Sequence, residues 1–215
     1  MSDNIPEWLR PYCTQNSYTP TEEDIESLDP QSRNEMLLKY FALNYSGSGG
    51  DSGGGVDPSI IERTATNITA DMLKGVTSIG SNAFYDYLSL TNVKIPNNVT
   101  SIGSQAFYNC RKLKSVKIPN SVTSIGGQAF EFCFSLVSVE IPNSVTSIDR
   151  EAFYNCSGLI SLTVKAATPP TLGDYAFKYT NAALVIYVPS ESVDAYKAAN
   201  NWSTYADKIQ AIPSE

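Results

Sequence analysis

The chain has 215 residues, 42% of them hydrophobic and 17% charged, which is enough apolar material for a core and excludes a wholly disordered chain. Its net charge of −7 argues against a nucleic-acid-binding surface as the main function. The chain contains no histidine, and this excludes histidine-dependent serine or cysteine catalysis, zinc sites with histidine ligands and histidine proton shuttles.

Residues 1–45 are predicted to form a small helical docking or anchor module in which acidic residues outnumber basic ones. A helix is expected to start at Pro30, because proline suits the first helical position. This helix would present an apolar stripe to an assembly partner, formed by Met36, Leu37, Tyr40 and Phe41. A segment this short rarely holds a sufficient core of its own. It is therefore expected to fold back on the chain, to self-associate or to dock onto a partner; an appendage without a separate role is the alternative.

Residues 46–55, SGSGGDSGGG, have the composition of a flexible linker, and residues 56–75 are predicted to cap the repeats that follow. No run of about 18 apolar residues predicts a membrane span. The N-terminal residues lack the basic start and the apolar stretch of a standard signal peptide. The localisation is therefore left open, with display on a virion or on a bacterial surface as the expectation.

Residues 76–189 are built from a 23-residue repeat. The copies that start at Val76, Val99, Val122 and Val145 each begin with VTSI, and an Ala-Phe pair follows. A looser fifth copy contains Ala176-Phe177, with one residue inserted before that pair. A period of about 20 to 29 residues with apolar residues at fixed positions is typical of leucine-rich repeats.

Each copy predicts one half-buried strand, seen in the alternation of Leu113, Val116 and Ile118. Pro119 ends this strand because proline has no N–H for the next ladder bond, and Asn120-Ser121 turns the chain. A single coil cannot bury its own apolar face. The copies are therefore predicted to stack as an α/β repeat solenoid with a parallel sheet of about five strands.

Residues 190–215 are predicted to close the far end of the stack as a helical cap. Ser190 is expected to be the N-cap of a short amphipathic helix. Trp202 is expected to pack on the last coil and not to serve as a ligand platform.

The repeated core VTSIGxxAFxxCxxLxxVxIPNS, carried most fully by residues 99–144, resembles the Treponema-type or BspA-like leucine-rich repeat family. The resemblance extends over about residues 60–212 and includes a terminal segment, residues 186–209, of a kind often found in these proteins. It implies a non-catalytic protein of bacterial or protist surfaces, or of phage particles. The implied role is adhesion or binding to host proteins and other cells.

No reactive constellation emerges from the other residues. Cys110, Cys133 and Cys156 share one position of successive copies, so they are expected to form a column of buried thiols, and a column does not converge on one metal ion. Asp149 and Glu151 are expected to lie on a solvated face. Serine-nucleophile motifs, phosphate-binding glycine loops and EF-hand patterns are absent from the sequence. We therefore expect no enzyme activity, no cofactor and no metal.

Two surfaces are candidate binding sites. The outward positions on and beside the predicted strands carry charged side chains, among them Lys94, Lys114, Lys117 and Glu140. The position after each Ala-Phe pair carries an aromatic row, made of Tyr85, Tyr108 and Tyr154. Tyrosine offers contact area at a low cost in conformational entropy, so this row suits contact with a protein or a glycan. Burial of the rings between coils is the alternative. The Thr-Ser pairs of the VTSI segments are instead expected to be structural.

These observations together predict a non-catalytic binding and display protein. Its array is expected to recognise a protein or a cell-surface glycan, and residues 1–45 are expected to attach it to a larger assembly, such as a phage or prophage virion. A bacterial surface adhesin of the BspA-like type that lacks its leader is one alternative. A purely structural decorating component is the other. No nucleic-acid partner is expected.

Overall fold

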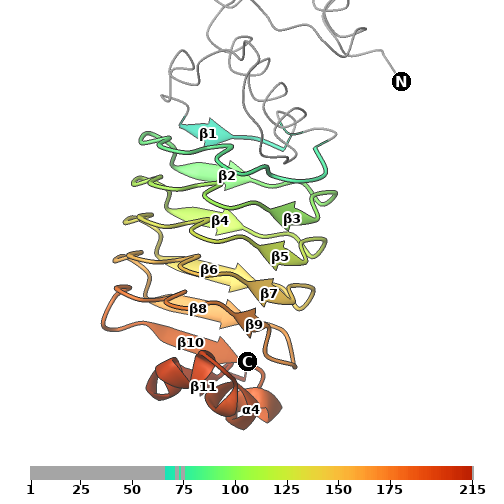
Figure 1. The fold of residues 1–215 in the computed structure, drawn as a ribbon, viewed down its shortest axis with the longest axis vertical. Helices are drawn as coiled ribbons and strands as arrows, with labels where there is room; N and C mark the ends of the chain where they lie inside the picture. The colour runs from blue at the N-terminus through green and yellow to red at the C-terminus, as the bar shows by residue number, and fades with distance from the viewer. Residues whose placement is uncertain (1–65, 71–72, 74–75, 215) are drawn as a thin grey trace, which may run out of the picture.

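The computed structural model describes residues 66–70, 73 and 76–214, which form a stack of coils (Figure 1). The coils contribute to a seven-stranded sheet in which every neighbouring pair is parallel. In spatial order the strands are β1 (Asn67–Ile68), β2 (Asn92–Lys94), β4 (Ser115–Lys117), β6 (Ser138–Ile141), β8 (Ser161–Val164), β10 (Val185–Val188) and β11 (Ile209–Ala211). The chain is therefore an α/β repeat solenoid. Residues 1–45, the linker and most of the predicted N-terminal cap lie outside the described residues.

Three of the VTSI segments and the matching segment of the fifth copy form a second parallel sheet. Its strands are β3 (Ser101–Ile102), β5 (Ser124–Ile125), β7 (Ser147–Ile148) and β9 (Thr171–Leu172). The five strands predicted from the repeats are confirmed as β2, β4, β6, β8 and β10, but strand pairing extends beyond them in two ways. The VTSI segments also pair from coil to coil, and β1 and β11 extend the first sheet beyond the repeats at both ends (Figure 1).

The strand register follows the sequence repeat. Val116 pairs with Val139, which stands 23 positions further along the chain. Between the fourth and fifth coils the offset grows by one residue, since Ile148 pairs with Leu172. The predicted insertion before Ala176-Phe177 is therefore confirmed, and the register shows that it lies ahead of β9.

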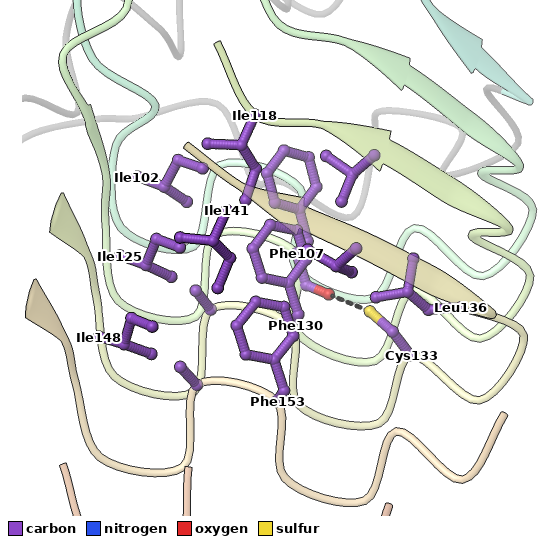
Figure 2. Close-up of a cluster of buried hydrophobic side chains, with 14 of the residues drawn as sticks. Ile102, Phe107, Ile118, Ile125, Phe130, Cys133, Leu136, Ile141, Ile148 and Phe153 are labelled. Carbon is purple, nitrogen blue, oxygen red and sulfur yellow. Dashed lines mark hydrogen bonds between the residues drawn. The ribbon is translucent and has the colours of Figure 1, made fainter. Parts of the chain in front are cut away.

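Columns of like side chains form the core (Figure 2). One column is a stack of phenylalanine rings with centroids 5.0 to 5.7 Å apart, made of Phe84, Phe107, Phe130, Phe153 and Phe177. Every one of these rings is buried. Figure 2 shows the isoleucines of the second sheet in a neighbouring column. The spacing of the rings follows from the separation of about 4.8 Å between parallel strands.

Hydrogen bonds within the turns and between the coils hold the stack. The Val122 N–H donates to the Pro119 carbonyl at 3.0 Å, which confirms the predicted turn at Asn120-Ser121. On the second sheet the Thr100 hydroxyl donates to the Thr77 carbonyl at 3.1 Å, and the later coils repeat this bond. The threonines are therefore structural, as predicted, although their partners are backbone carbonyls.

The C-terminal cap contains η2 (Ser190–Ser192), α4 (Val193–Ala198) and η3 (Trp202–Lys208). Trp202 is fully buried, and its indole N–H donates to the Pro170 carbonyl at 2.8 Å, so its role as a cap residue is confirmed. The prediction of Ser190 as an N-cap is wrong. The Ser190 hydroxyl bonds to the Glu191 carboxylate at 3.1 Å, because the chain enters η2 directly from Pro189.

Two positions of each coil, on either side of the Ala-Phe pair, have a left-handed backbone with positive φ. The first position is occupied by Asn82, Gln105, Gln128, Glu151 and Tyr175, and the second by Asp86, Asn109, Phe132, Asn155 and Tyr179. Asparagine and aspartate tolerate this conformation, whereas it is strained for bulky side chains. The aromatic residues at these positions therefore stand out.

Candidate binding surface

Aromatic side chains line the edge of the solenoid formed by the Ala-Phe turns. Tyr85 stacks on Tyr108 with ring centroids 4.6 Å apart. Tyr108 meets Phe132 edge-on at 5.3 Å, and Phe132 meets Tyr154 at 6.4 Å. Tyr154 in turn meets Tyr179 at 5.2 Å. We call these five residues the aromatic stripe, and it crosses all five coils without a break.

The structure brings the predicted tyrosine row together only in part. Tyr85 and Tyr108 are in direct contact, but Tyr154 joins them only through Phe132. All three tyrosines are half-buried, so they pack between coils and also present an edge to solvent. The prediction missed Phe132 and Tyr179, which stand where other copies hold Asp or Asn. An aromatic residue at a position that otherwise favours asparagine was the signal available in the sequence.

Glu131 interrupts the row at the position that holds tyrosine in three other copies. Its side chain is buried, and one carboxylate oxygen has no hydrogen-bond partner among the described residues. Desolvation raises the pKa of the Glu131 carboxyl, repulsion from Glu151 adds to this, and a hydrogen bond from Gln128 opposes it. Burial of an incompletely paired carboxylate costs stability.

The cost of Glu131 predicts a pH dependence. The pKa of Glu131 is higher in the folded than in the unfolded state. Protonation of Glu131 therefore favours folding at a pH below the unfolded-state pKa of about 4.3, and this stabilisation is lost as the pH rises through the folded-state pKa. We expect Glu131→Gln to gain stability over the wild type as pH rises from 4 to 7, measured by urea unfolding. Glu140→Gln, an exposed control, should not show this trend. A pH-independent difference would contradict the prediction.

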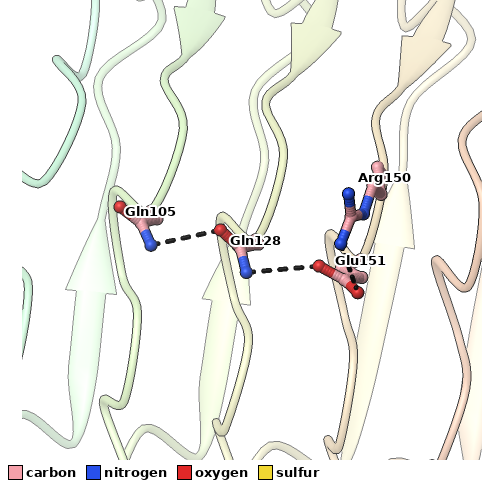
Figure 3. A network of polar contacts seen from close by, with 4 residues as sticks. All are labelled: Gln105, Gln128, Arg150 and Glu151. Atoms are coloured by element: carbon pink, nitrogen blue, oxygen red, sulfur yellow. Dashed lines mark hydrogen bonds and ion pairs between the residues drawn. The ribbon is translucent and has the colours of Figure 1, made fainter.

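A polar ladder links three successive coils (Figure 3). The Gln105 amide donates to Gln128 at 3.1 Å, and the Gln128 amide donates to Glu151 at 3.2 Å. Arg150 pairs with the other Glu151 oxygen at 3.1 Å. The expectation of a solvated face is met by Asp149 but is wrong for Glu151, whose side chain is only 14% exposed. Because both carboxylate oxygens of Glu151 bond to Gln128 and Arg150, Asp149 and Glu151 do not form a free carboxylate pair.

The predicted charged residues lie on the outer face of the seven-stranded sheet. Lys94, Lys117 and Glu140 are register partners on β2, β4 and β6. Glu140 pairs with Lys165 at 2.8 Å, whereas the lysines form no ion pair with another described residue. Lys114 lies just before β4. In the next coil the same position holds Val137, which is 47% exposed. The sheet face is therefore a small basic patch beside exposed apolar side chains.

The three array cysteines form a column of free, buried thiols, as predicted. Each S–H donates to a phenylalanine carbonyl of the preceding coil, for example Cys133 to Phe107 at 3.3 Å. Desolvation raises the pKa of Cys110, Cys133 and Cys156. Among the described residues, no group of acidic, cysteine or histidine side chains is arranged to hold a metal ion.

The buried column predicts unreactive thiols. Since the thiolate is the reactive form, and burial disfavours it, we expect no labelling of Cys110, Cys133 or Cys156 by iodoacetamide at pH 8 in the native protein. All three should label completely in about 8 M urea, a strongly denaturing concentration. Peptide mass spectrometry reads the extent of labelling at each cysteine. Labelling of any of them in the native state at the denatured rate would contradict the packing.

Comparisons with known proteins agree with this geometry. The family model described as the BspA type leucine-rich repeat region matches residues 77–203 in six copies. A T. pallidum leucine-rich repeat protein has a TM-score of 0.53 and 26% identity, with 63% of this chain and 66% of that chain covered. The pneumococcal vaccine antigen PcpA has a TM-score of 0.52 and 17% identity, with 72% and 41% covered. The chain thus spans less than two thirds of either structure. No curated protein matches it.

The described part of the chain contains no helix with the length and apolarity needed to cross a membrane. The repeat model covers more than half of the chain, and the strand register and the phenylalanine column carry the same repeat in three dimensions. The chain therefore belongs to the BspA-type leucine-rich repeat family.

Proposed function

We propose that the protein is a non-catalytic recognition protein whose aromatic stripe contacts a protein or a cell-surface glycan. The observation that carries this proposal is the unbroken series of aromatic contacts across five coils on one edge of the solenoid. Aromatic residues dominate the energetics of binding interfaces, whereas a purely structural edge needs none. Membership of a repeat family typical of binding and adhesion supports the same reading.

Strain in the stripe supports a role beyond packing. Phe132 has a φ of 61°, where Asn109 and Asn155 stand in neighbouring coils. A bulky residue in this conformation costs of order 1 kcal/mol or more relative to asparagine. The fold therefore tolerates asparagine at this position, and the aromatic ring is retained at a cost. Such residues cluster at functional sites.

Phe132→Asn tests the proposal. The variant should keep its unfolding midpoint near that of the wild type, since relief of strain offsets the lost ring contacts. Its binding to an array of extracellular-matrix proteins and mammalian glycans should fall at least about tenfold, as expected for an interface hot spot. Lys117→Gln on the sheet face is the matched surface control. Unchanged binding by Phe132→Asn together with loss in Lys117→Gln would move the site to the basic patch on the seven-stranded sheet.

The proposed setting is display on a larger assembly, with residues 1–45 as the attachment module. Its support is the sequence: an apolar stripe in an acidic segment ahead of a glycine-serine linker. This plan would suit a virion protein or a surface adhesin. Light scattering of the full chain and of a chain that starts at Val56 tests the module. An oligomeric full chain with a monomeric shorter chain supports self-assembly through residues 1–45, and two monomers exclude it.

A further inference from the structure

Two tyrosines on the last coil are unusually exposed. Tyr175 and Tyr179 have 54% and 59% of their surface accessible, more than any other exposed large hydrophobic residue among those described. At the other end of the stripe, Tyr85 and Tyr108 instead stack face to face and cover one another. At the last coil the series ends, and no further coil covers these two rings.

A lysine lies against both rings. The Nζ atom of Lys178 is 4.4 Å from the ring centroid of Tyr175 and 5.0 Å from that of Tyr179. Lys178 occupies the position that Tyr85, Tyr108 and Tyr154 hold in other coils. A cation held over aromatic rings is stabilised by the ring quadrupoles and keeps its outward N–H groups free to donate. The three side chains therefore form one preassembled group.

Neither burial nor backbone preference explains the two tyrosines. Their φ values are 60° and 59°, in the left-handed region that disfavours bulky side chains. The equivalent positions of the other coils hold mainly polar residues, such as Gln105 and Gln128 for Tyr175, and Asn109 and Asn155 for Tyr179. Strained, exposed aromatics at two positions of one coil point to contact with a ligand.

The charges around the group favour an anionic ligand. The nearby carboxylates already have partners: Asp174 accepts from Asn201 at 3.2 Å, and Glu151 pairs with Arg150 at 3.1 Å. Lys178 forms no ion pair with another described residue. An anion placed on Lys178 would meet an ammonium that the protein leaves without a counter-charge.

Building on the proposed function, we propose that Tyr175, Lys178 and Tyr179 form a subsite for a carboxylate-bearing sugar residue. The exposed ring surface that Lys178 leaves uncovered suits the apolar C–H face of a pyranose, and the ammonium suits its carboxylate. The ring centroids of both tyrosines lie within 5.0 Å of the one Lys178 ammonium. A group of this size has room for one sugar residue that carries one carboxylate. A long acidic peptide would need several free cations, and this coil offers one.

Titration by NMR of the full chain with 3′-sialyllactose, a hyaluronan tetrasaccharide and neutral lactose tests the subsite. We expect at least one acidic sugar to bind at least tenfold more tightly than lactose. Lys178→Gln should remove this preference. Tyr179→Asn and Tyr175→Gln, which introduce residues that the other coils carry at the same positions, should weaken binding of the acidic sugar at least fivefold. Lys197→Gln, which changes a lysine on α4, is the matched charge control and should bind like the wild type.

Several outcomes would overturn the subsite: equal binding of acidic and neutral sugars, no binding of either acidic sugar, or a Lys178→Gln variant that keeps the preference. Binding of a hexaglutamate peptide in place of both sugars would also overturn it. Phe132→Asn separates this inference from the proposed function, since Phe132 lies away from Lys178. If Phe132→Asn loses the macromolecular partner while no acidic sugar binds, the stripe stands and the sugar subsite fails.

Discussion

Phe130→Ala should destabilise the array by about 3 to 5 kcal/mol, the cost typical of removing a buried phenylalanine ring. Phe130 lies in the middle of the stacked column, with ring centroids 5.1 Å from Phe107 on one side and 5.1 Å from Phe153 on the other. The ring is fully buried. Because hydrogen bonds between coils hold the backbone on both sides, the coils cannot collapse into the void, and the cavity cost is added to the lost burial.

The measurement is urea unfolding monitored by circular dichroism. The change in the free energy of unfolding is calculated with the same m-value, its dependence on urea concentration, for wild type and variant. Phe134→Ala removes the same ring from a half-buried site near Arg111, so it is the matched control and should cost less than half as much. Equal losses in the two variants would show that the column does not carry more of the stability than the surface does. That result would contradict the packing described here.

The repeat made most of the fold predictable, because one coil determines the next. The period, the half-buried strand and the insertion in the fifth copy all follow from residues that recur at fixed spacing. The second sheet did not follow. Strands such as β3 (Ser101–Ile102) are two residues long, which is too short for alternation of buried and exposed residues to be recognised. Their pairing depends on how coils stack, which is a contact between residues far apart in the sequence.

The binding surface was less predictable for a related reason. The tyrosine row followed from equivalent positions, but the path of the stripe shifts by one position at Phe132 and again at Tyr179. The sequence shows that asparagine or aspartate stands at these positions in other copies, and the left-handed backbone supplies the physical reason. Glu131 is a second case: the sequence left its position open between an exposed row and burial between coils, and the structure buries its charged side chain. Departures from the repeat therefore mark the residues that need a structural or functional explanation.

Gly126→Ala should cost about 1 to 3 kcal/mol, the range typical of overpacking. Two neighbouring coils approach closely at this glycine. A Cβ atom there would lie 2.6 Å from the Ser104 nitrogen and 2.7 Å from the Gly103 carbonyl carbon. Both atoms belong to the backbone of the preceding coil, and the Gly126 N–H is itself bonded to the Ile102 carbonyl at 2.8 Å. Relief of the clash therefore requires the two coils to separate and to weaken that bond.

The next residue supplies the control. A Cβ atom at Gly127 would meet only the Arg150 carbonyl oxygen, at 3.3 Å. The free energy of unfolding of Gly127→Ala should therefore stay within about 1 kcal/mol of that of the wild type. The alanine also makes the unfolded chain less flexible, which favours folding. Asp149 is the equivalent of Gly126 in the fourth coil and carries a Cβ atom; by the same register it faces Gly127, where the second coil has Ser104. Urea unfolding of the two alanine variants should therefore give a clearly lower midpoint for Gly126→Ala. Equal midpoints would mean that the coils separate at little cost, and that side chains in the core, not close backbone approach, hold the stack together.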